Sequence, residues 1–493
     1  MLRSDHVTRR SMLVAAFGFG TAVALSACGA AVSAPGAQPN AAVATVASSS
    51  AVATTVAAAT STASATTVAN VAAATTVASA AAAPAAGQQS VTVWSWTSIE
   101  GWPQWQQAGK LFTQKYPDIH LEMQHVPYGS YWEKVSVSYA GGVAPDILYL
   151  PPVNCHDLGV KGVLLDLTPF ANSTKFDLSN ITASTQQPYM WGGKIYAINA
   201  MNDTSFTVYN QDLLSAAGFS ALPEEWHTPD FSTSQFLDIA TKITNPAKQQ
   251  WGYAIPGEDL HWVYLFGGQL WNDDAYPTAS ALDSAEATAG LQFMQDLIYK
   301  YKVAPSPAEM SGLGGSSAIG PTDDIFKTGK VGMVWGRNKN LATIFKPITA
   351  FKFSATSFPK AGQQPRRTDI GINGFGIVSK SKAAASAWKW IEWMTADQGN
   401  ATIMGYVSLP ANKLVDSYKV SPLPKWQVKL TLDALPNAWN SAPHPNVRPE
   451  MFTAINASVD ELLLNKKPGK QVGAEAAQKV NAIFKQLGPV VPK

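Results

Sequence analysis

Apolar side chains beyond the first ninety residues recur with two different periods. Residues 91–96 (Val-Thr-Val-Trp-Ser-Trp) are apolar and β-branched, as in a strand, and residues 102–116 repeat apolar positions at helical spacing. A strand over 119–126, a helix over 131–139 and a nearly continuous apolar strand over 145–150 follow. This succession predicts a parallel sheet covered by helices on both faces.

The same two periods continue to the end of the chain. Further predicted strands cover residues 206–210, 252–256, 331–335, 351–358 and 374–378. Further predicted helices cover residues 211–217, 233–243, 260–266, 284–301, 383–394, 449–464 and 473–486. The predicted fold class is therefore α/β, and ligands of such sheets bind beyond the C-terminal ends of the strands.

The N-terminal segment has a different character, because no charged residue occurs between Arg10 and Glu100. A charged start is followed by an apolar stretch over residues 11–25, which is of signal-peptide length and too short to span a membrane. Arg9-Arg10 resembles a twin-arginine export signal, although paired arginines also occur in general secretory signals. We interpret residues 1–27 as a signal peptide.

Cys28 ends the sequence Leu-Ser-Ala-Cys, which resembles a bacterial lipobox, so this cysteine is predicted to carry a lipid. Residues 28–88 are then a low-complexity stalk of Ala, Val, Thr and Ser. Such a segment cannot bury enough apolar surface to offset the entropy of ordering it, so we expect a flexible coil whose ends lie about 40 Å apart. A helical spacer and glycosylation of its Ser and Thr remain open. Either form would hold a globular head off a membrane.

Composition limits what the head can bind. The chain carries a net charge of +2, and all sixteen tryptophans follow residue 88. A nearly neutral head lacks the basic footprint that nucleic acid requires. Abundant aromatic rings with few charges fit a neutral, hydroxylated partner. We expect a monomer.

The two cysteines exclude some chemistries. With Cys28 assigned to the lipid, Cys155 has no partner for a disulfide within the chain, and no Cys/His spacing typical of zinc occurs. We therefore expect neither a metal nor another cofactor. Cys155-His156-Asp157 could be read as a nucleophile with a base, but catalytic partners are usually distant in sequence. A structural cysteine is the favoured interpretation.

Several motifs occur in an order that resembles a known family. Gly-Gly-Val-Ala-Pro-Asp-Ile over residues 141–147 matches a Gly-x-x-Pro-Asp-Ile motif, and residues 193–197 and 208–214 match "GK-x-Y" and "YN-x-D-L" segments. Residues 326–332 and 371–379 complete the pattern. In this respect the head resembles the carbohydrate-type extracellular solute-binding proteins of ABC importers, the maltose-binding-protein-like family 1.

The resemblance implies a two-lobed, periplasmic-binding-protein-like fold. Each lobe would be a sheet flanked by helices, and a multistrand hinge would join the lobes. Crossings near Ser205, Pro347 and Ser408 would make both lobes discontinuous. The first lobe would comprise residues 89–205 and 348–407, and the second would comprise residues 206–347 and 408–493.

Sugars present apolar faces and hydroxyl edges, so a sugar site needs aromatic rings together with hydrogen-bonding side chains on loops that face a cleft. Core packing remains an alternative for Trp96 and Trp262, a solvated turn for Asp203, and a surface charge for Arg337. Arg448, near His444, is a further possibility. The candidate ligand contacts are Trp96, Glu100, Asn154, Asn202, Asp203, Glu258, Trp262, Arg337, Asn338 and Asn373.

One departure from the family pattern concerns the ligand itself. Leu150 stands where the family has an aromatic residue, and Pro151-Pro152 alters the following turn, which argues against maltose. We expect a lipid-anchored protein at the outer face of the cell membrane that captures a sugar or oligosaccharide and delivers it to the permease subunits of an ABC importer. No chemistry on the ligand is expected. The alternatives are an exported glycoside hydrolase with paired carboxylates, or a surface lectin or sensor with the same fold.

Overall fold

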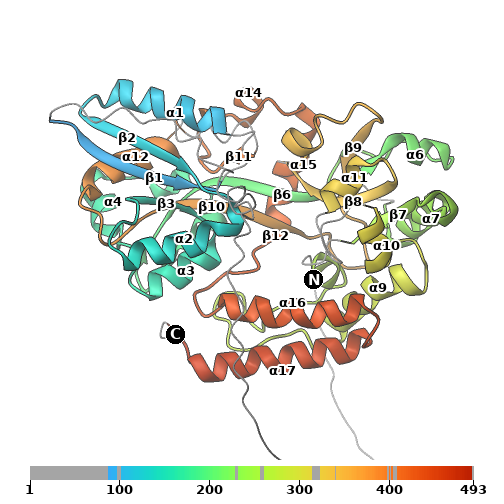
Figure 1. Ribbon diagram of the computed structural model, residues 1–493. Coiled ribbons are helices and arrows are strands. Elements are labelled where there is room, and N and C mark those ends of the chain that lie inside the picture. Colours follow the sequence, from blue (N-terminus) through green and yellow to red (C-terminus); the bar gives the residue numbers. More distant parts are fainter. Residues whose placement is uncertain are drawn as a thin grey trace, which may run out of the picture. The chain divides into compact units, whose positions relative to one another are not determined.

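The protein is described by a computed structural model (Figure 1). The described residues are 87–96, 102–227, 231–255, 260–313, 322–338, 340–396, 399, 401–402 and 408–490. The predictions for the signal peptide, Cys28 and nearly all of the stalk lie outside these residues. Within the described residues, no helix is both long enough and apolar enough to span a bilayer.

The first lobe is built on β1 (Gln89–Ser95), which lies between β2 (Ile119–His125) and β3 (Ile147–Leu150) and pairs in parallel with both. Figure 1 shows these strands at the left of the molecule, coloured blue to teal. The predicted succession of parallel strands is therefore confirmed.

Helices cover both faces of this sheet. The buried side chains of α1 (Trp102–Lys115) and α12 (Ala384–Thr395) share one apolar core, while those of α2 (Tyr128–Ala140) and α3 (Pro152–Val160) share another (Figure 1). The smaller elements of this lobe are α4 (Thr168–Thr174), α5 (Ala183–Gln186), β4 (Met190–Trp191) and β5 (Lys194–Ile195).

The two lobes share one long strand, β6 (Ile198–Asn210), in which every residue is buried. The sequence predicts only its last five residues as a strand, because polar side chains dominate its first half. That first half pairs antiparallel with β10 (Thr368–Ile377), whereas the second half pairs with β8 (Val331–Arg337) and β9 (Phe353–Thr356). The partner changes at Ser205, where the first crossing was predicted.

The second and third crossings lie later than predicted. Because β9 pairs with the second half of β6, and Lys360 donates its backbone N–H to Phe231, residues 348–367 belong to the second lobe and the chain returns within β10. The prediction near Pro347 is therefore corrected. β11 (Leu409–Pro410) still pairs with the first half of β6, so the last crossing follows it and Ser408 precedes that crossing.

In the second lobe, β8 lies between β6 and β7 (Trp251–Ala254). Helices enclose this sheet, and α9, α16 and α17 pack against one another (Figure 1). The α/β, two-lobed fold class with a multistrand hinge is confirmed. The remaining elements are α6 (Gln211–Ala216), α7 (Thr233–Ile243), α8 (His261–Leu265), α9 (Ala285–Tyr299), α10 (Pro307–Gly312), α11 (Thr322–Lys327), α14 (Ser417–Val420), α15 (Lys425–Ala434), β12 (Ala438–Trp439), α16 (Pro449–Leu463) and α17 (Gly469–Leu487).

Side-chain caps explain why several helices begin where the sequence predicts. The Ser232 hydroxyl accepts the backbone N–H of Gln235 at the start of α7, and Ser284 does the same for Ala287 at the start of α9. Each cap satisfies one of the donors that a helix N-terminus leaves without an intrahelical partner. The predicted and observed bounds of α7 are identical for this reason.

Candidate ligand site

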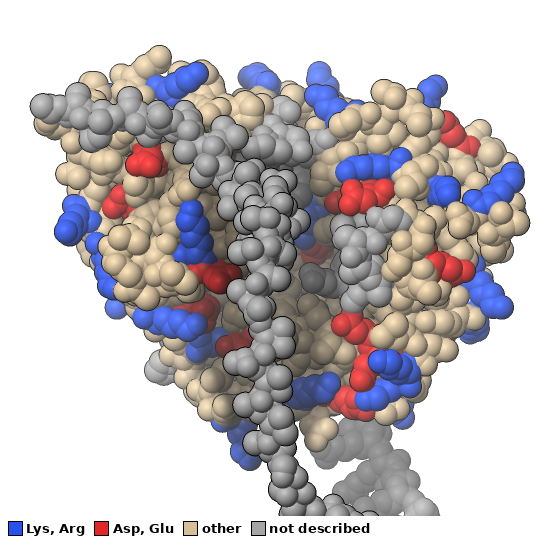
Figure 2. Space-filling view, in the orientation of Figure 1, with Lys and Arg blue, Asp and Glu red and all other residues tan. Residues whose placement is uncertain are grey.

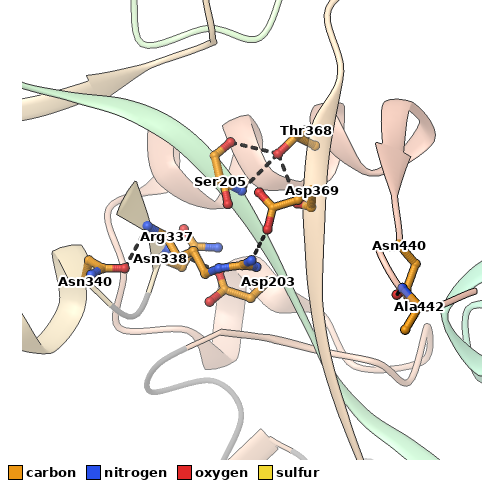
Figure 3. Close-up of polar contacts among 9 residues, drawn as sticks. All are labelled: Asp203, Ser205, Arg337, Asn338, Asn340, Thr368, Asp369, Asn440 and Ala442. Carbon is orange, nitrogen blue, oxygen red and sulfur yellow. Dashed lines mark hydrogen bonds and ion pairs between the residues drawn. The ribbon is translucent and has the colours of Figure 1, made fainter. Parts of the chain in front are cut away.

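The first of two polar regions near the junction of the lobes surrounds Asp203 and Asn338. The carboxylate of Asp203 accepts the backbone N–H of Asn338 at 3.1 Å, so β6 is tied to the end of β8 (Figure 3). The amide of Asn338 donates to the Thr431 hydroxyl at 2.6 Å and accepts from Gln427 at 2.9 Å. Both side chains are buried and engaged within the protein, which is the behaviour of hinge residues.

Arg337 forms an ion pair with Asp369 in the same region (Figure 3). Their side chains are 20% and 11% exposed, so the pair is largely withdrawn from water. Gly371 makes room for it, since a Cβ atom there would lie 2.4 Å from a terminal nitrogen of Arg337. Arg337 therefore joins β8 to β10 and is not the isolated surface charge that the sequence left open.

Asn202 and Asn373 lie on the first-lobe side of the hinge. Asn202 is buried, accepts from Asn199 at 3.1 Å and lies 3.4 Å from the Thr182 hydroxyl. The amide nitrogen of Asn373 lies 3.6 Å from the sulfur of Met201, while its oxygen has no partner among the described residues. Of these two candidates, Asn373 retains the greater capacity to bind a ligand.

Trp96 and Asn154 lie where β1 and β3 end. The indole of Trp96 donates to the Tyr149 carbonyl at 3.1 Å, and its ring meets the exposed Tyr128 edge-on, with centroids 5.0 Å apart. Asn154 is half-buried in the first turn of α3 and makes no side-chain hydrogen bond to the described residues. Both positions could contact a molecule at the edge of the sheet.

Trp262 occupies the core of the second lobe. It is 1% exposed, and its ring packs against Phe236, Tyr253 and Phe293. Trp262 is therefore a core residue, which is the alternative that the sequence left open. Glu100 and Glu258 lie outside the described residues.

A second polar region centres on a pair of stacked rings. Tyr264 from α8 and Trp439 from β12 lie parallel, with centroids 3.6 Å apart and planes inclined by 11°. The guanidinium of Arg367 lies 5.2 Å from the Tyr264 centroid, within the range of a cation–π contact. β12 runs beside β10, so the stack lies close to the hinge.

Asp274 adds a carboxylate to this region. Burial raises its pKa, while the charge of Arg367 acts in the opposite direction. One of its oxygens is buried without a hydrogen-bond partner among the described residues. A half-buried acid of this kind can accept hydrogen bonds from a ligand.

Other buried polar atoms near the hinge also lack partners among the described residues. Native proteins leave few such atoms unsatisfied, so a group of them suggests a place where a ligand completes the hydrogen bonding. In the second lobe they include Tyr264 Oη, Trp335 Nε1, Trp439 Nε1, Asn440 Nδ2, Arg448 Nε and Asp274 Oδ1. Of these residues, only Arg448 was predicted from the sequence as a possible ligand contact.

The lobes also contact each other away from the hinge strands. Val153 of α3 packs against the core of the second lobe, and α3 lies beside α16. Burial, with a smaller contribution from the nearby charges of His444 and Arg448, lowers the pKa of His156 to about 3, although its hydrogen bond to the Pro188 carbonyl acts in the opposite direction. The charged residues visible in Figure 2 are of both signs on both lobes, and the described surface recedes between the lobes.

The Cys155-His156 pair has no arrangement for nucleophilic chemistry. Burial raises the pKa of the Cys155 thiol well above its ordinary value. The Nε2 atom of His156 lies 2.5 Å from the Pro188 carbonyl, which can only accept, so Nε2 carries the proton. Within the described residues, no group of three His, Cys, Asp or Glu is placed to hold a metal.

The chain matches the model of a known protein family. A family model described as bacterial extracellular solute-binding protein matches residues 94–401, well over half of the chain. A galactooligosaccharide-binding protein of Bacillus subtilis (strain 168) is 22% identical over 297 residues, which are 59% of this chain and 65% of that protein.

Solved structures show the same fold. An ABC substrate-binding protein from Listeria monocytogenes in complex with cycloalternan has a TM-score of 0.69 at 23% identity, covering 81% of this chain and 99% of that one. UgpB from Mycobacterium tuberculosis in complex with glycerophosphocholine has a TM-score of 0.67 at 16% identity, covering 81% and 100%. At these identities the likeness concerns the fold alone.

Proposed function

Because the chain belongs to the family of bacterial extracellular solute-binding proteins, we propose that it captures a carbohydrate between its lobes and delivers it to an ABC importer. Membership of this family implies an extracytoplasmic location. The proteins it resembles are substrate-binding proteins and not enzymes. The choice of a carbohydrate is our proposal.

The observation that carries it is the stack of Tyr264 on Trp439 beside Asp274 and Arg367. Aromatic rings pack against the C–H faces of sugars, and a carboxylate with a guanidinium binds hydroxyl groups. Because Tyr264 is 1% exposed and Trp439 is 7% exposed, Trp439 is the ring that such a ligand would meet, and Tyr264 supports it from the core. The buried donors and acceptors without partners would be satisfied by such a ligand. The first lobe would contribute Trp96, through its position at the end of β1, and more polar groups from β10 and α3.

The proposed mechanism is lobe closure over the ligand. The hinge consists of β6, β10 and the end of β8, and the contact of α3 with the second lobe would form and break as the lobes move. A ligand that touches both lobes stabilises the closed form by its differential affinity for that form. The importer would then recognise closed, loaded protein.

Titration of tryptophan fluorescence with a sugar panel tests this function. The panel includes galactooligosaccharides and α-glucans, because relatives bind sugars of these kinds, and glycerophosphocholine as a ligand of another class. Saturable binding without turnover is expected. Steady release of reducing ends by the pure protein would instead indicate a hydrolase.

We also propose that Cys28 anchors the protein through lipid and that the stalk keeps the head near its importer. Tethering raises the local concentration of the head at the permease. One acyl chain binds a membrane only marginally, so stable anchoring needs more than one. Metabolic labelling with a fatty acid should mark wild type and not Cys28→Ala. Equal labelling of the two would contradict the anchor.

A further inference from the structure

The segment from Trp439 to Arg448 presents hydrogen-bond donors without acceptors. Its buried side-chain atoms that lack partners among the described residues are Trp439 Nε1, Asn440 Nδ2 and Arg448 Nε. All three are N–H groups, which can only donate. Trp439 and the neighbouring Ala442 and Val447 belong to one apolar core, so the segment is packed as part of the second lobe.

The orientation of the Asn440 amide follows from its own turn. Its oxygen accepts the backbone N–H of Ala442 at 2.9 Å (Figure 3). The oxygen is thus in use, and the NH₂ group is the end left for another molecule. Trp439 is held equally firmly by its stack on Tyr264 and by the pairing of β12 with β10.

Arg448 adds a full positive charge at the N-cap of α16, a helix of 15 residues whose N-terminus favours anions. It forms no ion pair with the described residues. Two acids of the same lobe are engaged elsewhere, because Asp273 accepts two backbone N–H groups of its own turn and the charge of Arg367 acts on Asp274. His156 of the first lobe is fully buried. It lies close enough to Arg448 for their charges to interact.

Sugar hydroxyls both donate and accept, and beside the stack Asp274 Oδ1 and the Tyr264 hydroxyl could serve them. The three unpartnered atoms of the Trp439–Arg448 segment, in contrast, only donate. A carboxylate or phosphate only accepts, and its bonds to charged donors are about twice as strong as bonds between neutral groups. We infer that the ligand of this site is a saccharide carrying an anionic group, a carboxylate or a phosphate, that binds Trp439, Asn440 and Arg448. This inference rests on the proposed carbohydrate function and specifies the class of ligand.

Matched ligands test it on the full chain. Isothermal titration with digalacturonate, with the neutral galactose disaccharide and with galactose phosphate compares a carboxylate, no charge and a phosphate. At least one anionic ligand should bind about tenfold or more tightly than the neutral one, as expected for one charge-assisted bond. Added salt should weaken only the anionic ligand.

Asn440→Asp is the sharpest variant, because it keeps the shape and the oxygen that accepts from Ala442 but replaces the NH₂ donor with a second acceptor. The anionic ligand should lose at least tenfold more affinity than the neutral one, since a hydroxyl can donate to the new carboxylate. Arg448→Gln should show the same selectivity. Gln478→Glu, the same change of charge on an exposed position of α17, serves as the control. Melting temperatures check that each variant folds.

The outcomes separate the two proposals. Tight binding of the neutral disaccharide alone, or equal losses for both ligands in Asn440→Asp and Arg448→Gln, would overturn the anionic ligand and leave the carbohydrate function intact. Binding of no saccharide at all would overturn the function itself. Preference for digalacturonate or for galactose phosphate supports the inference and identifies the anionic group.

Discussion

Two polar regions lie beside each other near the junction of the lobes, and they differ in how their buried groups are satisfied. In the hinge, Asp203, Asn338 and Arg337 are bound to protein partners on neighbouring elements. Even so, Arg337 Nη1 and Asp369 Oδ1 are buried without a hydrogen-bond partner among the described residues. Around the Tyr264–Trp439 stack, the buried side-chain atoms of Asp274, Trp439 and Asn440 that lack such partners belong to no ion pair between strands. Polar groups that satisfy one another hold a structure together, whereas those left unsatisfied are available to a ligand.

The roles of individual candidate residues also differ from those expected from the sequence. From the sequence, Asp203 and Arg337 were predicted as ligand contacts. The structure ties both to other strands, so we now expect their loss to affect folding and lobe geometry first. Arg448, a minor candidate from the sequence, is the better candidate for a ligand contact, because its buried Nε has no partner among the described residues.

The largest expected effect compares two arginines. Arg337→Met keeps the apolar stem but leaves Asp369 buried without its partner, so the free energy of unfolding should fall by about 3 kcal/mol. Arg448→Met should change stability by no more than about 0.5 kcal/mol, since it breaks no ion pair with the described residues. Denaturant unfolding of both variants measures the difference, and equal losses would remove the distinction between the two regions.

The next effect is a pH dependence that comes from His156. Its folded pKa of about 3 lies below the ordinary 6.5, so below pH 6.5 the unfolded chain takes up a proton that the folded protein does not. Stability is therefore fully present above pH 6.5 and is lost as pH falls toward 3, by roughly 2 kcal/mol at pH 5.

His156→Gln keeps a donor for the Pro188 carbonyl but cannot titrate. The change in unfolding free energy between pH 7 and pH 5 should be smaller in this variant than in wild type. Identical pH profiles would mean that His156 is not buried as a neutral group.

The smallest effect concerns Asp274. Burial raises the pKa of the Asp274 carboxyl, so its charged form is unfavourable in the folded protein. Asp274→Asn removes that charge and should raise the melting temperature slightly at pH 7. The difference should disappear at pH 4, where the folded protein binds a proton at Asp274 more readily than the unfolded chain does. Ligand affinity should nevertheless fall about tenfold. A destabilised variant with unchanged affinity would place Asp274 in the structural region.

Much of the architecture could be predicted from local pattern, and the errors have identifiable causes. Helix α7 was predicted with its observed bounds, because its apolar spacing and its Ser232 cap both depend on nearby residues. β6 was predicted too short because its first half is polar although buried, and that segment is stabilised by pairing with β10. The second crossing was placed too early because β9 carries no local sign of which lobe it joins.

The site shows the same division. Trp96, Asn154 and Asn373 could be selected because they lie at strand ends or in a family motif. Tyr264, Asp274, Arg367 and Trp439 could not be brought together from the sequence, since Arg367 and Trp439 are distant in the chain from Tyr264 and Asp274. One signal was available in retrospect, because Trp439 and Asn440 are an aromatic–polar pair in the segment that leads to the last two helices.

The sequence by itself determined the α/β class, the order of the elements and the resemblance to a family of binding proteins, because periodicity and short motifs are local properties. Only the tertiary structure decided which polar residues satisfy one another and which do not. Hydrogen bonding between Asp203 and Asn338, and stacking of Tyr264 on Trp439, join residues more than a hundred positions apart. Whether a buried polar group holds the hinge or is available to the ligand depends on such distant partners, and no local pattern contains them.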